Sequence, residues 1–286
     1  MERVGDHVDA LGECALWSAE ERALYWVDIR APAIRRWDFS SEATTSWTVP
    51  GLVGSIALMQ RERLLVALPD RLATFDVRRG MFEDVLPLAA RHADMRCNDG
   101  RTDRQGRFWF GTMNNVTRAP EGALYRLDRG NRCVKLFSGI QIPNGLAWSP
   151  DSRVMYFADS LTYTIYKYRF DPDTGTPSER QVFAKTTPPA IPDGACVDSE
   201  GYLWSAEYGG WRLTRYAPDG NVERTIDLPV ENPTSCTFGG PDLDILYVTT
   251  ATQKMRPGQL AAQPLAGTIL AFRPGVTGLP EPLYRE

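Results

Sequence analysis

The chain has few of the side chains that usually build metal or nucleophile centres. Its 286 residues include only two histidines, His7 and His92, and five cysteines with no CxxC pair. An odd cysteine count without paired spacing argues against a disulfide framework and against a structural zinc site. Any bound metal must therefore be held mainly by oxygen, and a histidine-based nucleophile would depend on His7 or His92.

Excess charge and long apolar runs are also missing. The 32 Lys and Arg residues face 36 Asp and Glu residues, so nothing indicates a nucleic acid or an anionic membrane as a partner. No apolar run approaches the roughly 18–20 residues of a membrane span, and the first residues lack the apolar segment of a signal peptide. We therefore expect a cytoplasmic protein, a monomer or weak oligomer, that acts on a small molecule.

What the sequence does contain is a repeat of short runs rich in aromatic and branched residues, as strands are. The runs are centred on Trp26, Leu65, Trp109, Tyr156, Trp204 and Tyr247. The steps between them are 39, 44, 47, 48 and 43 residues, and polar turn clusters precede most of them. A period of about 40–50 residues with several strands per unit is typical of a propeller blade. We predict an all-β, six-bladed β-propeller forming one domain over residues 1–286; a β-sandwich with coincidental spacing is the alternative.

A short motif stands 11 to 13 residues ahead of each run. The innermost segment of a blade faces the propeller axis, so motifs in equivalent blade positions should meet around one point. Four of them carry an oxygen side chain that can bind metal, namely Glu13, Asn98, Asn144 and Asp193. The other two read Gly54-Ser55 and Thr234-Ser235, which indicates an asymmetric site rather than a repeated structural turn.

Two carboxylates and two amide carbonyls form a hard, oxygen-only ligand set. Such a set suits one Ca²⁺, Mg²⁺ or Mn²⁺ ion best, and Zn²⁺ or Fe(II) can also bind if water completes the shell. Two carboxylates leave the bound ion formally neutral, so its burial near the axis is tolerable. The alternative is structural, because Pro-Asn-Gly and Pro-Asp-Gly are strong turn formers wherever they occur.

These motifs resemble the gluconolactonase/regucalcin family, also called the senescence marker protein family, over nearly the whole chain. The resemblance is carried by Leu11-Gly-Glu-Cys-Ala-Leu-Trp, Arg96-Cys-Asn-Asp-Gly, Gly106-Arg-Phe-Trp-Phe-Gly-Thr-Met, Ile142-Pro-Asn-Gly-Leu-Ala-Trp, Pro192-Asp-Gly-Ala-Cys and Thr234-Ser-Cys-Thr-Phe-Gly-Gly. It implies a six-bladed propeller with one axial divalent ion, bound directly by Glu13, Asn144 and Asp193. It also implies that Arg96 and Asn98 contact the substrate and that Asp193 is the catalytic base.

The family resemblance implies hydrolysis of sugar lactones such as glucono-, xylono- and galactonolactones. The metal would polarise the carbonyl, and Asp193 would accept a proton from water. One departure concerns the loop after Gly-Thr-Met, where mammalian family members carry a glutamate and this chain has Asn114-Asn115-Val116-Thr117. The alternatives are a non-catalytic metal-binding propeller and an aryl ester or phosphoester hydrolase on the same scaffold.

Three further expectations concern packing. Strand alternation should point Cys14 and Cys97 away from the axis, as small buried apolar residues. Five tryptophans should form core between blades rather than a sugar-stacking platform, namely Trp17, Trp26, Trp109, Trp148 and Trp204. A propeller ring must also close, and we expect the segment Glu281-Pro-Leu-Tyr-Arg to pair beside residues near Val8.

Overall fold

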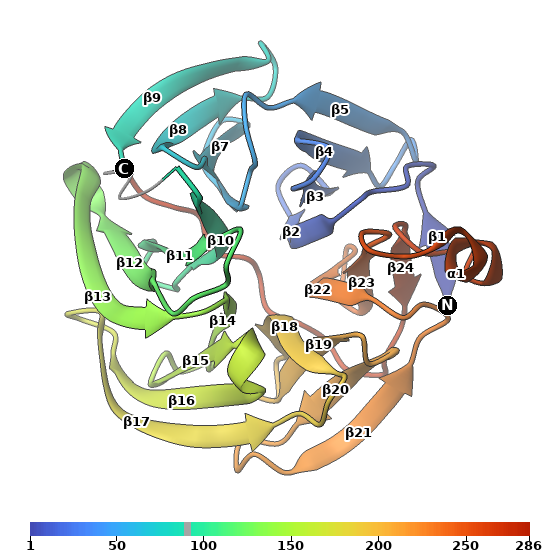
Figure 1. Cartoon of the computed structure of the whole chain (residues 1–286). Coiled ribbons are helices and arrows are strands. Elements are labelled where there is room, and N and C mark those ends of the chain that lie inside the picture. The colour runs from blue at the N-terminus through green and yellow to red at the C-terminus, as the bar shows by residue number, and fades with distance from the viewer. Residues whose placement is uncertain (89–92) are drawn as a thin grey trace.

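The computed structural model of the chain describes residues 1–88 and 93–286 and forms the predicted six-bladed, all-β propeller. Six four-stranded sheets surround a central axis, and the first strand of each sheet lies nearest to that axis (Figure 1). Each aromatic run of the sequence repeat forms the second strand of its blade. The repeat therefore marks the strand whose large side chains pack between neighbouring sheets.

In five blades the strands follow the chain from the axis outward, and in the sixth the outer strand is the N-terminal β1. The innermost strands are β2 (Gly12–Ser18), β6 (Ser55–Leu58), β10 (Met95–Thr102), β14 (Pro143–Trp148), β18 (Ile191–Val197) and β22 (Pro233–Gly239). The second strands are β3 (Ala23–Asp28), β7 (Arg63–Ala67), β11 (Phe108–Asn114), β15 (Val154–Asp159), β19 (Leu203–Tyr208) and β23 (Ile245–Thr250). The third strands are β4 (Ala33–Asp38), β8 (Arg71–Asp76), β12 (Gly122–Asp128), β16 (Thr164–Asp171), β20 (Arg212–Tyr216) and β24 (Ile269–Phe272). The outer strands are β5 (Thr44–Thr48), β9 (Met81–Pro87), β13 (Arg132–Ile140), β17 (Thr176–Lys185), β21 (Val222–Asp227) and β1 (Glu2–Val4).

Helical structure is confined to short pieces on the loops. The structure has one α-helix, α1 (Pro257–Ala262), between β23 and β24, and two 3₁₀ turns at Arg129–Asn131 and Ser160–Thr162 within the ranges described. In the same ranges no helix is long and apolar enough to cross a membrane.

The core lies between blades, where aromatic rings from adjacent sheets meet. Trp17 stacks on Tyr247 with ring centroids 5.7 Å apart, joining the first blade to the sixth. Trp109 and Trp148, from the third and fourth blades, lie 5.6 Å apart. All five tryptophans assigned to the core are at most 5% exposed. This confirms that they pack between blades and are not available for stacking on a sugar.

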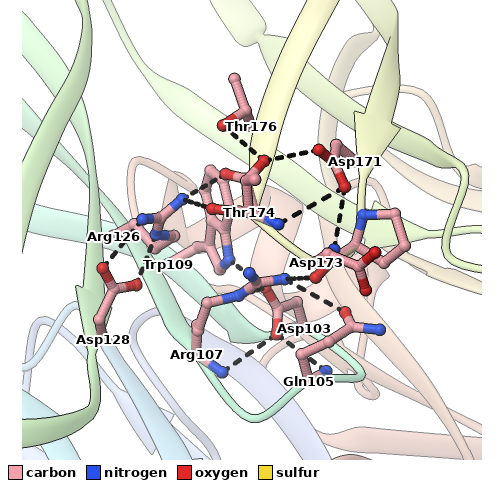
Figure 2. A network of polar contacts seen from close by, with 12 residues as sticks. Asp103, Gln105, Arg107, Trp109, Arg126, Asp128, Asp171, Asp173, Thr174 and Thr176 are labelled. Carbon is pink, nitrogen blue, oxygen red and sulfur yellow. Dashed lines mark hydrogen bonds and ion pairs between the residues drawn. The ribbon is translucent and has the colours of Figure 1, made fainter.

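Buried carboxylates fix several of these tryptophans. Asp103 accepts hydrogen bonds from Trp109 Nε1 (2.9 Å) and Arg107 Nε (2.6 Å), as Figure 2 shows. Arg107 also donates to a backbone carbonyl of the hairpin between β16 and β17 in the next blade (2.8 Å). Asp198 holds Trp204 Nε1 in the same way at 2.9 Å. These networks fix the indole orientation and join adjacent blades, which gives the axial strands a rigid frame.

The ring closes through the N-terminal strand. β1 pairs with β24 antiparallel, with Val4 opposite Ile269, so both chain ends contribute to the sixth blade. The prediction that Glu281–Arg285 pairs near Val8 is wrong. Pro280 and Pro282 flank Glu281 and lack the N–H that a ladder needs, so this tail does not extend a sheet.

The C-terminal tail instead crosses the axis on the far side of the propeller. Figure 1 shows it passing behind the central opening from β24 toward the second blade. There, Tyr284 N–H donates to Leu58 O (2.8 Å) and Arg285 N–H donates to Gly106 O (3.0 Å). The tail therefore connects the sixth blade to the second and third blades. It does so at one end of the axis, and the loops that join strands two and three of each blade lie at the opposite end.

Candidate metal and substrate site

Bulges in the innermost strands present the polar side chains that the sequence analysis selected. The ladder register shifts directly after Glu13, Cys97, Asn144 and Pro192. A bulge inserts an unpaired residue, bends the strand and re-aims its side chains. In the second blade, β6 pairs with β7 without such a shift, and the described residues of that blade contribute no polar side chain to the site. In the sixth blade, β22 does shift register, between Pro233 and Ser235. The absence of a bulge therefore accompanies only one of the two motifs that lack a metal-binding oxygen side chain.

The re-aimed side chains meet in one pocket of about 150 Å³ on the axis. Five blades line it, and all five residues selected from the sequence are among its lining: Glu13, Arg96, Asn98, Asn144 and Asp193. Each of these five is at most 8% exposed. The distant motifs therefore form one enclosed polar site, as their shared blade phase predicts.

Two carboxyl groups at this site share a hydrogen bond with each other, Glu13 and Asp193. Burial raises the pKa of Asp193 well above its usual range, and the charges of Glu13 and Asp99 raise it further. Burial also raises the pKa of Glu13, with Asp99 again adding to the effect. The pair can therefore stay together only by holding a proton or by binding a cation that replaces it.

The neighbouring amides are fixed in orientation by a chain of hydrogen bonds. Ser160 Oγ donates to Pro192 O (2.7 Å) and accepts from Asn144 Nδ2 (2.8 Å). The Asn144 Oδ1 oxygen then accepts from Asn98 Nδ2 (3.0 Å), and Asn98 Nδ2 also donates to Pro143 O (2.9 Å). Asn144 thus keeps an oxygen lone pair for a ligand, whereas Asn98 turns its own oxygen toward Arg96.

Arg96 is a buried guanidinium beside the amides. Its Nη1 donates to Asn98 Oδ1 (2.7 Å) and to Cys97 O (2.8 Å), and its Nε donates to Asn115 Oδ1 (2.9 Å). In the part of the chain that the structure describes, Nη2 donates no hydrogen bond. That nitrogen is therefore free to donate to a molecule in the pocket.

Two aspartates at the ends of second strands position the segments that lead into Glu13 and Asn144. Asp28 accepts from the backbone N–H groups of Ala10 (2.8 Å) and Leu11 (3.1 Å), just ahead of Glu13. Asp159 does the same for Gln141 (3.1 Å) and Ile142 (3.0 Å), just ahead of Asn144. The loop backbone is thus held by charge-assisted hydrogen bonds just ahead of Glu13 and Asn144.

The donor set fits a hard divalent cation. Among the described residues, no three His, Cys, Asp or Glu side chains form a metal-binding group by themselves. A cation here would need amide and water oxygens besides the two carboxylates, which is the coordination that oxygen-seeking ions accept. The repulsion within the buried carboxylate pair supplies the driving force for such binding.

Neither cysteine near the site is a plausible nucleophile. Cys14 and Cys97 are buried, and burial raises the pKa of Cys97 to about 12. Burial raises the pKa of Cys14 still further above its usual range. The bulge after Glu13 interrupts the strand alternation that we assumed, and Cys14 takes a left-handed φ of 53°. Its thiol nevertheless packs away from solvent, near the carbonyl of Ile56 at 3.5 Å.

The loop that departs from the family pattern, residues 114–117, is held in place by the side chain of Asn114. Asn114 Oδ1 accepts from the N–H groups of Val116 (3.0 Å) and Thr117 (2.9 Å). The Oδ1 oxygen of Asn115 accepts from two residues that line the pocket, Arg96 and, at 3.4 Å, Arg30 Nη2. A neutral amide therefore bridges two cations here. His92 lies outside the described residues.

The sequence analysis missed a second group of lining residues. They share a position on or just after the second strand of a blade, and they include Arg30, Arg118, Ser160, Tyr208, Gln253 and Lys254. The sequence repeat indicates which loops carry them, because the loop after each aromatic run opens on the same face as the motif before it. It does not indicate which residues of those loops reach the pocket, since the loops differ in length.

Comparisons with known proteins agree with this architecture. The family model described as "SMP-30/Gluconolactonase/LRE-like region" matches residues 11–252. The chain is 37% identical over 279 residues to 6-deoxy-6-sulfogluconolactonase of Pseudomonas putida, covering 96% of this chain and 94% of that protein. It is 35% identical over 288 residues to regucalcin of Gallus gallus, covering 98% and 96% of the two chains.

Solved structures show the same relationship. A calcium-binding protein, regucalcin, from Agrobacterium tumefaciens superposes with a TM-score of 0.94 at 29% identity, covering 100% of this chain and 98% of that one. A gluconolactonase from Xanthomonas campestris shares the fold with a TM-score of 0.74 at 22% identity, covering 95% and 91%. The sequence, the propeller and its axial pocket together place this chain in the SMP-30/gluconolactonase/LRE-like family.

Proposed function

We propose that the protein hydrolyses sugar-acid lactones to aldonic acids with the help of one divalent metal ion. Glu13, Asn144 and Asp193 would hold the ion, and Arg96 with Asn98 would contact the lactone. The substrate class is of the glucono-, xylono- or galactonolactone type. The ion is one of Ca²⁺, Mg²⁺, Mn²⁺, Zn²⁺ or Fe(II), because an oxygen ligand set discriminates poorly among them.

The observation that carries this proposal is the buried carboxylate pair beside a guanidinium with a free donor. Glu13 and Asp193 are 8% and 6% exposed and carry raised pKa values, so they are kept in contact at a cost to the fold. Raised carboxyl pKa values in a pocket are typical of functional sites. The relatives named as lactonases support the reaction class, and the relative named as calcium-binding supports a divalent ion.

The chain's own groups fit the steps of lactone hydrolysis. A bound divalent ion supplies a Lewis acid for the carbonyl and lowers the pKa of a coordinated water. Asp193 accepts the proton as water oxygen bonds to the carbonyl carbon, and it can return that proton to the ring oxygen when the ester C–O bond breaks. Arg96 Nη2 is placed to donate to the developing oxyanion or to a ring hydroxyl.

Acid release from gluconolactone and xylonolactone tests the proposal. We expect hydrolysis that falls at least ~100-fold when a chelator removes the metal or when Asp193 is changed to Asn, a loss in the range seen on removing one essential catalytic group. Asp242→Asn is the matched control, because Asp242 is exposed on the loop between β22 and β23 and lines no part of the pocket. Undiminished hydrolysis by Asp193→Asn would rule out this mechanism.

A metal-binding protein without turnover is the second candidate, favoured by the calcium-binding relative. Stoichiometric metal binding together with no acid release from any lactone in the panel would establish it. Phenyl acetate belongs in the same panel, since faster cleavage of this aryl ester than of the lactones would instead indicate an aryl esterase.

A further inference from the structure

The outer part of the axial pocket is lined by four cationic side chains. They come from the first, third and sixth blades and are Arg30, Arg96, Arg118 and Lys254. Arg96 is buried, Arg30 and Arg118 are half-buried, and Lys254 is exposed. The cations thus extend from the amides around the carboxylate pair out to solvent.

These cations lack acidic partners in the described ranges. Arg30 donates to two neutral amides, Gln253 Oε1 and Asn115 Oδ1, both at 3.4 Å. Arg118 Nη1 lies 3.6 Å from the Met113 sulfur. Other half-buried arginines of this protein do pair with carboxylates, as Arg36 does with Glu21 at 3.3 Å. At the pocket mouth, by contrast, several cations stand together without such a partner in the described ranges.

The cations also lie close enough to repel one another. Burial lowers the pKa of Arg96 to about 9, and the charges of Arg118 and Arg30 contribute to the shift. Arg30 likewise contributes to a lowered pKa of Arg118, after burial. Arginine side chains keep their charge in proteins, so the repulsion among these cations persists until an anion enters.

The acidic residues that line the pocket do not cancel this charge. Glu13 and Asp193 are the only acidic side chains in the described lining. A divalent ion on them would make that pair neutral, and a shared proton would leave at most one negative charge. In either case the four cations keep a net positive mouth above the reaction site.

We infer that Arg30, Arg118 and Lys254 form an anion subsite for a negatively charged substituent of the lactone, remote from its ester carbonyl. A phosphate, sulfonate or carboxylate on the last carbon of the sugar has the required chemistry, since guanidinium groups bind such oxyanions through paired N–H donors. This assignment rests on the proposed function for the orientation of the lactone, with its carbonyl toward Asp193. It adds a substrate class, namely anionic sugar lactones.

Binding of two sugar acids tests the subsite without relying on turnover. Gluconate and 6-phosphogluconate share the carboxylate that hydrolysis produces and differ in the remote phosphate. By isothermal titration calorimetry we expect the wild-type protein to bind 6-phosphogluconate at least about ten-fold more tightly, as a charged hydrogen-bonding group allows. Glucarate, with a remote carboxylate, distinguishes a general anion site from one that needs phosphate.

Variants that each remove one positive charge show which residues cause the preference for 6-phosphogluconate. We expect Arg30→Gln and Arg118→Gln each to reduce the preference for 6-phosphogluconate about five-fold or more. Lys135→Gln is the matched control, because it removes one charge from an exposed site on β13 at the periphery. Asn115→Asp sharpens the test, since it places a carboxylate between Arg30 and Arg96 and should weaken 6-phosphogluconate binding without removing any cation.

The outcomes separate this inference from the proposed function. Turnover of gluconolactone combined with equal binding of both acids would overturn the subsite and leave the lactonase proposal standing. A preference for 6-phosphogluconate that disappears in Arg30→Gln, without turnover of any lactone, would support the subsite and overturn the lactonase proposal. A preference that both Arg30→Gln and Arg118→Gln leave intact would overturn the subsite.

Discussion

The two ends of strand β10 present buried charge to the axis in opposite ways. At its start, Arg96 and Asn98 adjoin a pair of carboxylates, Glu13 and Asp193, that touch each other and form no ion pair in the described structure. At its end, Arg101 forms an ion pair with Glu281 of the C-terminal tail, with N–O distances of 3.0 and 2.7 Å. At the start of β10 the carboxylate pair has no counter-charge bound to it among the described residues, whereas at the end of β10 Arg101 is neutralised by Glu281 of the same chain.

This difference separates binding from structure. A buried charge that the chain itself neutralises contributes to the fold, because the partner is always present. A buried pair of like charges has no such partner and must obtain one from solution. The lower end of the axis, where β10 ends at Arg101, therefore anchors the tail across the propeller. The upper end, where β10 begins beside Glu13 and Asp193, is where we propose that a cation binds. The following predictions test this division, beginning with the largest expected change.

Removing the partner at the lower end should cost the most stability. Glu281→Ala leaves Arg101 enclosed without a counter-charge, since the two side chains are only 8% and 12% exposed. We expect a loss of about 3–5 kcal/mol in the free energy of unfolding, measured with urea. Glu286→Ala is the control, because its ion pair with Arg63 is largely exposed and should contribute about 0–1 kcal/mol. Equal losses in both variants would contradict the structural role of the tail.

Metal should stabilise the protein only through the upper end. At a free metal concentration of 100 times the dissociation constant we expect about 2.7 kcal/mol of added stability in the wild-type protein. Thermal unfolding with and without chelator measures it, and Asp193→Asn should abolish the difference. A metal-induced shift that survives in this variant would place the ion elsewhere.

The metal-free protein should also respond to pH in a defined direction. The raised carboxyl pKa values mean that folded Glu13 and Asp193 hold protons that the unfolded chain releases. Stability should therefore fall as pH rises above the usual carboxyl range, because the folded state binds more protons there. Saturating metal should flatten this dependence, since the cation takes the place of the proton.

A smaller loss of stability and of metal affinity should follow when the Asn144 side chain loses its hydrogen bond to Ser160. Ser160→Ala removes the hydroxyl that accepts from Asn144 Nδ2 at 2.8 Å and should cost about 1 kcal/mol of stability. It should also lower metal affinity several-fold, because the Asn144 oxygen is no longer held in place. Ser199→Ala is the control: its hydroxyl bonds Thr277 at 2.9 Å on the exposed surface, far from the pocket. Unchanged metal affinity in Ser160→Ala would remove Asn144 from the ligand set.

Most of the fold could be read from the sequence, because its signal is periodic. The aromatic runs mark the second strand of every blade, and their spacing sets the number of blades. The closing strand β1 could not be found this way, since three residues, Glu2–Val4, carry no recognisable pattern. The tail was misplaced for a related reason: Glu281 is fixed by an ion pair with Arg101, and sequence periodicity contains no information about such a contact.

Part of the candidate site could likewise be predicted from the sequence, and part could not. The sequence predicts that Glu13, Asn98, Asn144 and Asp193 lie together, because equivalent positions in successive blades meet at the axis. All four line the same pocket. The bulges that aim these side chains were not predictable, because their register shifts depend on how adjacent strands pair. The cations at the mouth lie on loops of unequal length, where no fixed spacing from the aromatic runs identifies them.

The most direct test of this account is a metal titration of chelator-treated protein, followed by calorimetry and by acid release from gluconolactone in the same sample. The account predicts one divalent ion per chain, with hydrolysis rising in proportion to occupancy, and neither binding nor hydrolysis in Asp193→Asn. Full hydrolysis by the metal-free wild-type protein would contradict it. So would an ion bound equally well by the variant.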